Sequence, residues 1–362
     1  MPDTVNLTMD AQSADTNLKV MPVQVIETDD GVILSRGSVQ FKIAGVGSFD
    51  VVHDLLTQLQ PPGATRAKVI NAFAGPAQPK LVRLLDMLIE RRLVTASETY
   101  PPSQSGDTAE DVFFWEFGLS ADEIRNQFAQ QDIHVVGVNR IGLALISALK
   151  QSGFDKATLI DAPLLRNMSL FEEDGFLKAD TLLKGDKPPV PEAIWTKRVE
   201  NGALPGLLVV TSEFGGMNLL RPWNEWTVGH GVSFLPIVLQ HLVGTIGPVV
   251  VPHETACYEC VRGRENSNME DPKLHRQLEA MAFEGQFAMG HHPLVPRMVA
   301  DHAAFELTKI FSGIGKGPIG RMITVSPLDC LVTTHRILKL PFCPVCGVNA
   351  DHAQPALGDI AG

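Results

Sequence analysis

The sequence lacks the features of three protein classes. Its five cysteines among 362 residues, four of them in two CxxC pairs, do not form a secreted disulfide framework. The polar residues 1–19 contain no signal-peptide core, and no uncharged apolar run reaches about 18 residues, the length that crosses a bilayer. The formal net charge of -11 disfavours nonspecific nucleic-acid binding. We therefore expect a cytoplasmic protein without membrane or nucleic-acid partners.

The two CxxC pairs predict a structural zinc site. Cys257 and Cys260 stand in HETACYECVRGREN, and Cys343 and Cys346 stand in LPFCPVCGVNA. Two such pairs complete a tetrahedral four-thiolate site with no open position, which is typical of a structural metal rather than a catalytic one. Two disulfides or four free thiols are the alternative interpretation. The fifth cysteine, Cys330, is expected to be a small buried apolar residue.

Composition divides the chain into four parts. A hydrophobic content of 44% is enough for two or three domains with their own cores. Residues 1–19 are polar and aperiodic, which predicts a disordered N-terminus. Residues 20–97 form a compact unit, residues 98–111 are a linker rich in Pro, Ser and Gly, and residues 112–362 form a large domain.

The compact unit reads as three strands followed by three helices, the order of a small winged helix-turn-helix. VQVIET, VIL and VQFKIA predict strands, separated by turns at Asp30-Gly31 and Arg36-Gly37, and Ser48 is the expected N-cap of the first helix. The third helix carries an apolar stripe of Leu81, Leu84, Leu85 and Leu88. Its acidic and basic residues are mixed, unlike a DNA-recognition helix, although a regulator or assembly protein built on a winged helix stays open.

A nucleotide-fold signature opens the large domain. A buried-strand run, a Gly-rich turn, a helix and a second strand ending in Asp161 are typical of a βαβ unit. The turn keeps the first and last glycines of GxGxxG, Gly137 and Gly142, but has Asn139 at the middle position. A side chain there obstructs the approach of the backbone to phosphate. The pattern therefore predicts the fold, with ATP not expected and the unit retained as a scaffold.

The βαβ unit, the late four-cysteine site and the phrase GPVVVPHETACYECVRGRENSN together resemble the ubiquitin-activating (ThiF/MoeB-like) superfamily. More narrowly, they resemble its leader-peptide-binding and cyclodehydratase partner proteins of thiazole/oxazole-modified microcins. The resemblance covers about residues 20–350 and implies an α/β fold. In that fold, a Rossmann-like ThiF-type domain with a zinc site follows a winged-helix recognition element for ribosomally synthesised peptides.

The ATP-handling positions of adenylating members are altered in this chain. Those members have an intact GxGxxG, an acidic pair after the second strand and a downstream Arg in an SNLNRQ-like segment, whereas here Asp161 is followed by Ala-Pro. Arg166 and Asn167 resemble remnants of that segment. Where a catalytic Asp is expected, the chain offers Glu213, Asn218 and Arg221. The resemblance therefore implies a partner subunit without catalytic residues, and an ATP-dependent adenylating enzyme acting on a peptide or sulfur-carrier C-terminus is the alternative.

In this family the leader peptide adds as an antiparallel strand beside the third strand and the third helix of the recognition element. The resemblance places the docking edge at Val39, Gln40, Phe41, Lys42 and Ile43, and the pocket wall at the leucine stripe of the third helix. Lys42, Lys80 and Arg83 would pair with acidic leader residues. Core packing for the leucines and a solvated face for the basic residues are the alternatives. The implied partners are the precursor leader peptide and a YcaO-type cyclodehydratase, and a homodimer is allowed.

Overall fold

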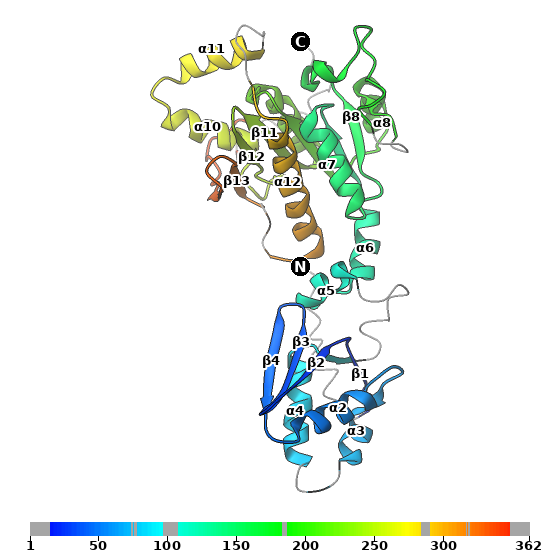
Figure 1. The fold of residues 1–362 in the computed structure, drawn as a ribbon. Coiled ribbons are helices and arrows are strands. Elements are labelled where there is room, and N and C mark those ends of the chain that lie inside the picture. Colours follow the sequence, from blue (N-terminus) through cyan, green and yellow to red (C-terminus); the bar gives the residue numbers. More distant parts are fainter. Residues whose placement is uncertain are drawn as a thin grey trace. The chain divides into compact units, whose positions relative to one another are not determined.

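The computed structural model describes residues 15–73, 75, 78–96, 108–182, 187–283, 290–315, 317 and 319–347. The chain divides into two compact units, Met1–Ile124 and Arg125–Gly362, which we describe separately (Figure 1). The sequence predicts a boundary at the 98–111 linker, whereas the structure places it later, within helix α6 (Ala121–Gln130). Residues 1–14 and 97–107, most of the predicted disordered and linker segments, lie outside the described residues.

The three predicted strands of the N-terminal unit form an antiparallel sheet. Its order is β2 (Gln24–Thr28), β3 (Gly31–Arg36), β4 (Val39–Ala44), so β4 is an edge strand. The first turn lies one residue earlier than predicted, because Gly31 already pairs with Ala44 in the sheet. A Cβ at Gly31 would lie 2.2 Å from the Ile43 carbonyl oxygen, so this pairing requires glycine.

Three helices follow, as predicted: α2 (Ser48–Gln58), α3 (Arg66–Ala72) and α4 (Gln78–Glu90). Ser48 is the first residue of α2 rather than its N-cap. Gly47, in the left-handed conformation, takes the cap position, and the Ser48 hydroxyl donates to the Ile43 carbonyl instead.

A second small sheet corrects the predicted disorder of residues 17–19. Strand β1 (Asn17–Val20) lies between β5 (Ala64–Thr65) and β6 (Val94–Ala96) and pairs antiparallel with both. Leu18 in this strand is fully buried. Burial of Leu18 and two sets of ladder hydrogen bonds stabilise a segment that looks polar in the sequence.

The leucine stripe of α4 lies in the core of the N-terminal unit. The side chains that form this core come from both sheets and all three helices, and include Leu18, Val32, Leu34, Val52, Leu55, Leu81, Leu84, Leu85, Leu88 and Trp115. Leu85 and Leu88 are fully buried, and Leu84, the most accessible leucine of the stripe, is only 9% exposed. Core packing is therefore the role of these leucines in the structure, and they do not form an open pocket wall.

Helix α5 (Ala109–Glu116) belongs to the N-terminal unit, although the sequence divides it between the linker and the large domain. Thr108 caps its first turn through a capping box. Trp115 is buried in the core of the unit, and its indole N–H donates to the Arg92 carbonyl at 2.9 Å. The Arg36 guanidinium lies 4.8 Å from the centre of the Trp115 ring. These contacts explain why the boundary lies beyond α5.

The C-terminal unit contains one eight-stranded sheet of order β14-β13-β12-β11-β10-β7-β8-β9. Its elements are β7 (Ile133–Val136), α7 (Arg140–Gln151), β8 (Thr158–Asp161), η1 (Pro163–Leu165), η2 (Met168–Leu170), β9 (Val190–Pro191), α8 (Glu192–Glu200), β10 (Leu207–Ser212), η3 (Met217–Leu220), α9 (Arg221–His230), β11 (Ser233–Gln240), β12 (Val243–Ile246), α10 (Tyr258–Asn268), α11 (Pro272–Phe283), α12 (Leu294–Ser312), β13 (Arg321–Ser326) and β14 (Leu331–Arg336).

The strands of the predicted βαβ unit, β7 and β8, are neighbours in this sheet and lie between β10 and the edge strand β9. Strands β7, β8, β10 and β11 are parallel, and every residue of β10 is buried, as expected for a strand covered on both faces. Helices α7 and α12 lie side by side and contact the sheet (Figure 1). Trp195, Trp223 and Trp226 pack in the core cluster that also contains Cys257, Cys260 and Cys343. Among the described residues, no helix is long and apolar enough to cross a membrane.

We predict that Trp115→Ala destabilises the N-terminal unit, because removal of a buried aromatic side chain costs about 3–5 kcal/mol. In hydrogen exchange on the full chain, the slowest amides of β3 and α4 will exchange roughly 100-fold faster or more. The slowest amides of β10 will not change. Phe117, 47% exposed, supplies the control: Phe117→Ala will cost less than about 1 kcal/mol. Unchanged exchange in β3 would show that α5 does not stabilise this unit.

Candidate functional site

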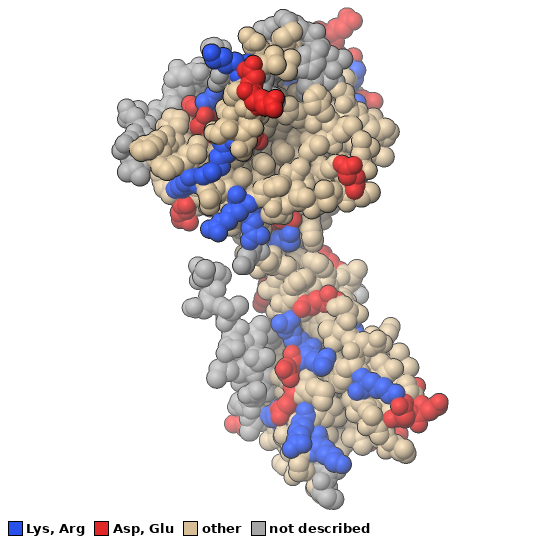
Figure 2. Space-filling model, turned by 90° about the vertical axis from the view of Figure 1, so that its left-hand side faces the viewer, with Lys and Arg blue, Asp and Glu red and all other residues tan. Residues whose placement is uncertain are grey.

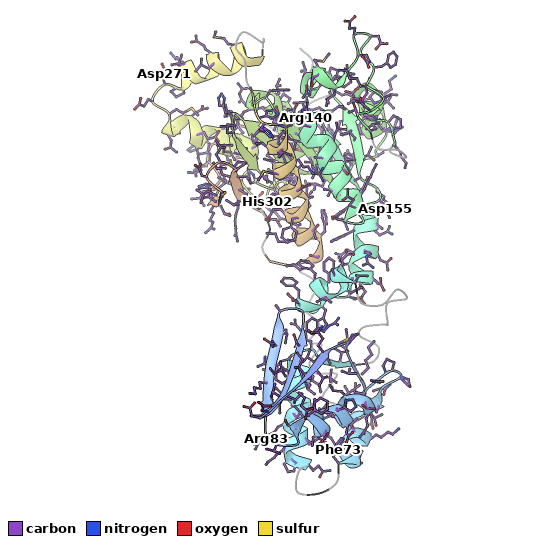
Figure 3. The ribbon with its side chains drawn as sticks, in the orientation of Figure 1. Phe73, Arg83, Arg140, Asp155, Asp271 and His302 are labelled. Atoms are coloured by element: carbon purple, nitrogen blue, oxygen red, sulfur yellow. The ribbon has the colours of Figure 1, made fainter. Side chains whose placement is uncertain are left out.

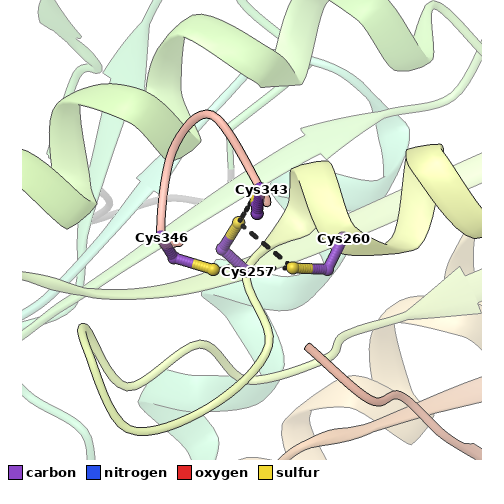
Figure 4. Close-up of side chains that lie close together, drawn as sticks. All are labelled: Cys257, Cys260, Cys343 and Cys346. Atoms are coloured by element: carbon purple, nitrogen blue, oxygen red, sulfur yellow. Dashed lines mark hydrogen bonds between the residues drawn. The ribbon is translucent and has the colours of Figure 1, made fainter. Parts of the chain in front are cut away.

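The four cysteines of the CxxC pairs meet in one cluster, as predicted. Cys257 caps α10 and Cys260 lies in its first turn, while Cys343 and Cys346 come from the turn at the end of the described chain (Figure 4). The Sγ–Sγ distances are 3.9 Å for Cys257–Cys260, 3.6 Å for Cys257–Cys343 and 3.5 Å for Cys260–Cys346, and all four Sγ atoms lie within 4.8 Å of one another. A tetrahedral zinc ion with Zn–S bonds of about 2.3 Å has sulfurs about 3.8 Å apart. The donor set therefore fits zinc.

The surroundings of the cluster support a thiolate site that is structural. The backbone N–H of Leu340 donates to Cys260 Sγ at 3.4 Å. Hydrogen bonds from the Cys257 and Cys346 thiols lower the pKa of Cys260, whereas the hydrogen bond to Cys260 raises the pKa of Cys257. Four sulfurs complete the coordination of a tetrahedral metal and leave no position for a substrate. Cys330 lies outside the cluster and is exposed, because it occupies the tight turn before β14, so its predicted burial is wrong.

The two glycines of the βαβ turn have a packing role. Gly137 has φ +115°, and a Cβ there would lie 2.7 Å from both the Asn139 amide nitrogen and the Thr211 hydroxyl. A Cβ at Gly142 would lie 2.1 Å from the Gly137 carbonyl oxygen. Strand β7 and helix α7 therefore approach closely only because both positions are glycine.

Asn139, at the middle position of the turn, is buried and bonded on every side. Its Oδ1 accepts from the Gly142 backbone N–H at 2.9 Å, so it is the N-cap of α7. Its Nδ2 donates to the carbonyls of Leu165 and Thr211, each at 3.0 Å. The residue that breaks the glycine pattern thus holds three chain segments together.

Glu213 is brought to the same helix start, from the loop after β10. Its Oε2 accepts from the Arg140 backbone N–H at 2.9 Å, and its Oε1 accepts from the Asn167 side-chain amide. Only 2% of Glu213 is exposed. Burial raises the pKa of Glu213, and the hydrogen bonds from Arg140 and Asn167 oppose that rise. Arg221, the other charged residue considered for this position, instead pairs with Glu259 through two hydrogen bonds of 2.7 and 2.8 Å.

Asp161, at the end of β8, is paired with Arg166. Two parallel hydrogen bonds of 2.7 Å join the guanidinium to both carboxylate oxygens. This pairing raises the pKa of Arg166. The guanidinium also lies 4.6 Å from the centre of the Phe171 ring. The five residues predicted as a degenerate nucleotide site are therefore together in space, with their polar groups bonded to one another and to neighbouring residues.

The predicted docking strand β4 offers one half-buried face and one exposed face. Val39, Phe41 and Ile43 pack against the core, whereas Gln40 and Lys42 are exposed. Lys42 forms an ion pair with Asp30 across the hairpin, so its charge already has a partner. The guanidinium of Arg91, the residue directly after α4, lies 5.0 Å from the centre of the Phe41 ring, which places the C-terminal end of α4 near β4. Arg83, also on α4, is exposed (Figure 3).

The register of the β3–β4 hairpin fixes which backbone groups face its free edge. A two-residue loop, Gly37-Ser38, separates the paired residues Arg36 and Val39, and such a pair shares hydrogen bonds. Bonded and non-bonded pairs then alternate along the ladder. The Gly45 N–H donates to the Asp30 carbonyl at 2.9 Å, as this alternation of bonded and non-bonded pairs requires.

In this register Val39, Phe41 and Ile43 direct their N–H groups toward β3. The N–H groups of Gln40 and Lys42 face the outer edge of the sheet, where none of the described strands pairs with β4. An extended peptide could therefore bind to these two donors. On the face shown in Figure 2, basic and acidic side chains of this unit are interspersed, unlike the basic stripe of a DNA-binding surface.

Solved structures share this fold. E. coli MccB in complex with MccA is 15% identical, with a TM-score of 0.64 over 91% of this chain and 99% of that chain. E. coli MccB with ATP is 16% identical, with the same TM-score and coverage. A heterocyclase in complex with substrate and cofactor is 16% identical, with a TM-score of 0.56 over 92% of this chain and 40% of that one. No protein-family model and no curated protein matches the sequence.

These likenesses confirm that the chain shares the fold of E. coli MccB, including its mixed α/β architecture. The narrower branch, the winged-helix assignment and the YcaO partner stay predictions. Because one related structure contains ATP, the comparisons do not support the expectation that ATP is not bound. Sequence reasoning named Glu213 but missed that it reaches α7. Its position directly after a buried strand of a parallel sheet was the available signal, since the carboxyl ends of such strands share one edge.

We predict that the purified protein binds roughly one zinc ion per chain and that Cys343→Ser loses most of it. The melting temperature and soluble yield will fall as well, because the metal joins the C-terminal turn to α10. Cys330→Ser is the matched control and will keep the wild-type zinc content. Metal analysis and thermal unfolding measure both effects. A folded wild-type protein with well under one zinc per chain would contradict the assignment.

Proposed function

We propose that the chain binds the leader peptide of a ribosomally synthesised precursor and presents that precursor to a YcaO-type cyclodehydratase. The product would be an azoline-containing, bacteriocin-like natural product. The observation that carries this proposal is the edge of β4, which pairs with no other described strand and lies near Arg91 at the end of α4, on a unit with its own core. The fold shared with MccB in complex with MccA, and with a heterocyclase in complex with substrate, supports a peptide partner.

The leader would add as a fourth strand beside β4. The outward N–H groups of Gln40 and Lys42 supply main-chain hydrogen bonds, which set the register of the peptide. Its alternate side chains would lie over the half-buried Val39, Phe41 and Ile43, which retain accessible apolar surface. The N-terminal unit would thus act as a winged-helix recognition element, with specificity from the β4 side chains rather than from the buried leucines.

Basic residues of α4, together with Arg91 directly after it, would give this edge a preference for acidic leaders. Lys80 and Arg83 are exposed on the helix, and Arg91 lies over Phe41. Lys42 contributes less to this preference because Asp30 already neutralises it. Exposed charges of this kind steer association and select partners more than they add affinity.

The C-terminal unit would dock the cyclodehydratase and keep the core peptide within its reach. Tethering raises the local substrate concentration without new chemistry. The closed four-cysteine cluster is consistent with a structural role for this unit. A YcaO-family gene and a short peptide gene beside this one would support the proposal.

An adenylating enzyme is the second candidate function. The fold shared with ATP-bound MccB and the carboxylate of Glu213 at the βαβ turn favour it. ATP–pyrophosphate exchange stimulated by a peptide substrate would establish this activity and displace the non-catalytic assignment.

We predict that Gln40→Pro weakens leader binding at least about tenfold. Proline removes the N–H of residue 40. This N–H points away from β3 and makes no hydrogen bond to it, so the native sheet is retained. Gln40→Thr keeps the N–H and will bind within about twofold of wild type. Fluorescence anisotropy with the synthetic leader encoded beside this gene measures both. Equal binding by the folded Gln40→Pro variant would exclude strand addition at β4.

We also predict that leader affinity resides in residues 1–124. The boundary includes β1 and α5, since a fragment of residues 20–100 would cut β1 and remove Trp115 from the core. A chain of residues 125–362 will lose leader binding by roughly 100-fold or more while keeping its zinc. Binding by that chain with wild-type affinity would refute a leader site on the N-terminal unit.

A further inference from the structure

The fold implies a nucleotide at the β7–α7 turn, and the residues there decide whether one fits. In nucleotide-binding βαβ units, the N–H groups of the turn and of the first helical residues bind phosphate. In this chain the Arg140 N–H donates to Glu213 and the Gly142 N–H donates to Asn139, each at 2.9 Å. Two of the donors available to a phosphate at this turn are therefore already bonded to side-chain oxygens of the chain itself.

We propose that Glu213 and Asn139 are built-in occupants of the phosphate position and that they exclude nucleotides from this unit. A carboxylate at the start of the 12-residue helix α7 is stabilised by the same N–H groups and helix dipole that would stabilise a phosphate. Its negative charge also repels a phosphate that approaches the same point.

Neither occupant can leave its position easily. Glu213 is almost completely buried and also accepts a hydrogen bond from the Asn167 amide, so displacement would leave donors of two residues unsatisfied. Asn139 is 1% exposed, and its amide also binds the carbonyls of Leu165 and Thr211. A nucleotide would have to break this network before it could bind.

The position expected for a ribose is filled in the same way. The acidic residue after the second strand of such units accepts hydrogen bonds from ribose hydroxyls. Here both oxygens of Asp161 accept from the Arg166 guanidinium at 2.7 Å. A neutral hydroxyl would have to compete with a charged, bidentate donor for this carboxylate. The phosphate and ribose positions are therefore both occupied by side chains of this protein.

The experiment measures binding of Mg-ATP and of inorganic pyrophosphate to the full chain by calorimetry. Wild type will bind each with a Kd weaker than about 1 mM. The double variant Asn139→Gly, Glu213→Gln will bind pyrophosphate at least about tenfold tighter, because it frees the Gly142 N–H and removes the buried charge. Glu172→Gln, which changes an exposed carboxylate of the same unit, is the control and will bind as wild type does.

If the double variant fails to fold, the single variant Glu213→Gln still tests the proposal, because glutamine has nearly the same shape as glutamate. Our proposal expects tighter pyrophosphate binding, whereas an adenylating enzyme that uses Glu213 with Mg-ATP would bind ATP more weakly after this change. Micromolar ATP binding by wild type, or no gain in the folded variants, would overturn the proposal. Leader affinity is measured in the same proteins. A wild type that binds no leader would contradict the proposed function, but it would not affect the proposal that nucleotides are excluded from this unit.

Discussion

The side chain of Asn139 connects the three segments that meet at the carboxyl edge of the central sheet. It caps α7 through Gly142, holds the loop after β8 through the Leu165 carbonyl, and holds the end of β10 through Thr211. An apolar residue here would leave three buried backbone groups unsatisfied, at about 1–3 kcal/mol each. The positions of Asp161 and Glu213 depend on these same segments, so one amide group organises the whole edge.

A glycine in a sequence pattern can serve either of two structural roles, and this network distinguishes them. Glycines in a βαβ turn permit both the contact of helix and strand and the approach of phosphate. Gly142 is required here for the first role, because a Cβ would collide with the Gly137 carbonyl. Two glycines can therefore persist in a turn whose phosphate position holds a carboxylate. A shared fold and a shared glycine spacing are then compatible with different ligands.

The four-cysteine cluster adds a second kind of attachment for the C-terminal segment of the described chain. Ile337, Leu340 and Val345 of this segment pack against the core of the C-terminal unit, whereas Leu338 and Phe342 are 54% and 86% exposed. Hydrogen bonds from Arg264 to the carbonyls of Leu338 and Lys339, and the contacts of Cys343 and Cys346 with Cys257 and Cys260, also join the segment to α10. A metal bound by the four sulfurs would add a long-range link to this packing.

Local signals in the sequence determined much of the fold. Alternating apolar residues and two-residue turns identified β2, β3 and β4. A buried run and a glycine turn identified β7 and α7, and the CxxC spacing identified the four cysteines that cluster in the fold. These features act over a few residues, so they can be read without knowledge of the partner segments. The leucine stripe of α4 was equally visible, but it could not reveal whether a peptide or the core covers it.

Tertiary contacts decided the rest. Strand β1 is short and polar in appearance, and it is ordered because Leu18 enters a core built from residues far along the chain. Helix α5 joins the N-terminal unit because Trp115 finds Arg36 and Arg92 there. Glu213 meets the start of α7 because parallel strands place their carboxyl ends at one edge of the sheet. In each case the stabilising partner is distant in sequence, and only the folded chain brings the two together.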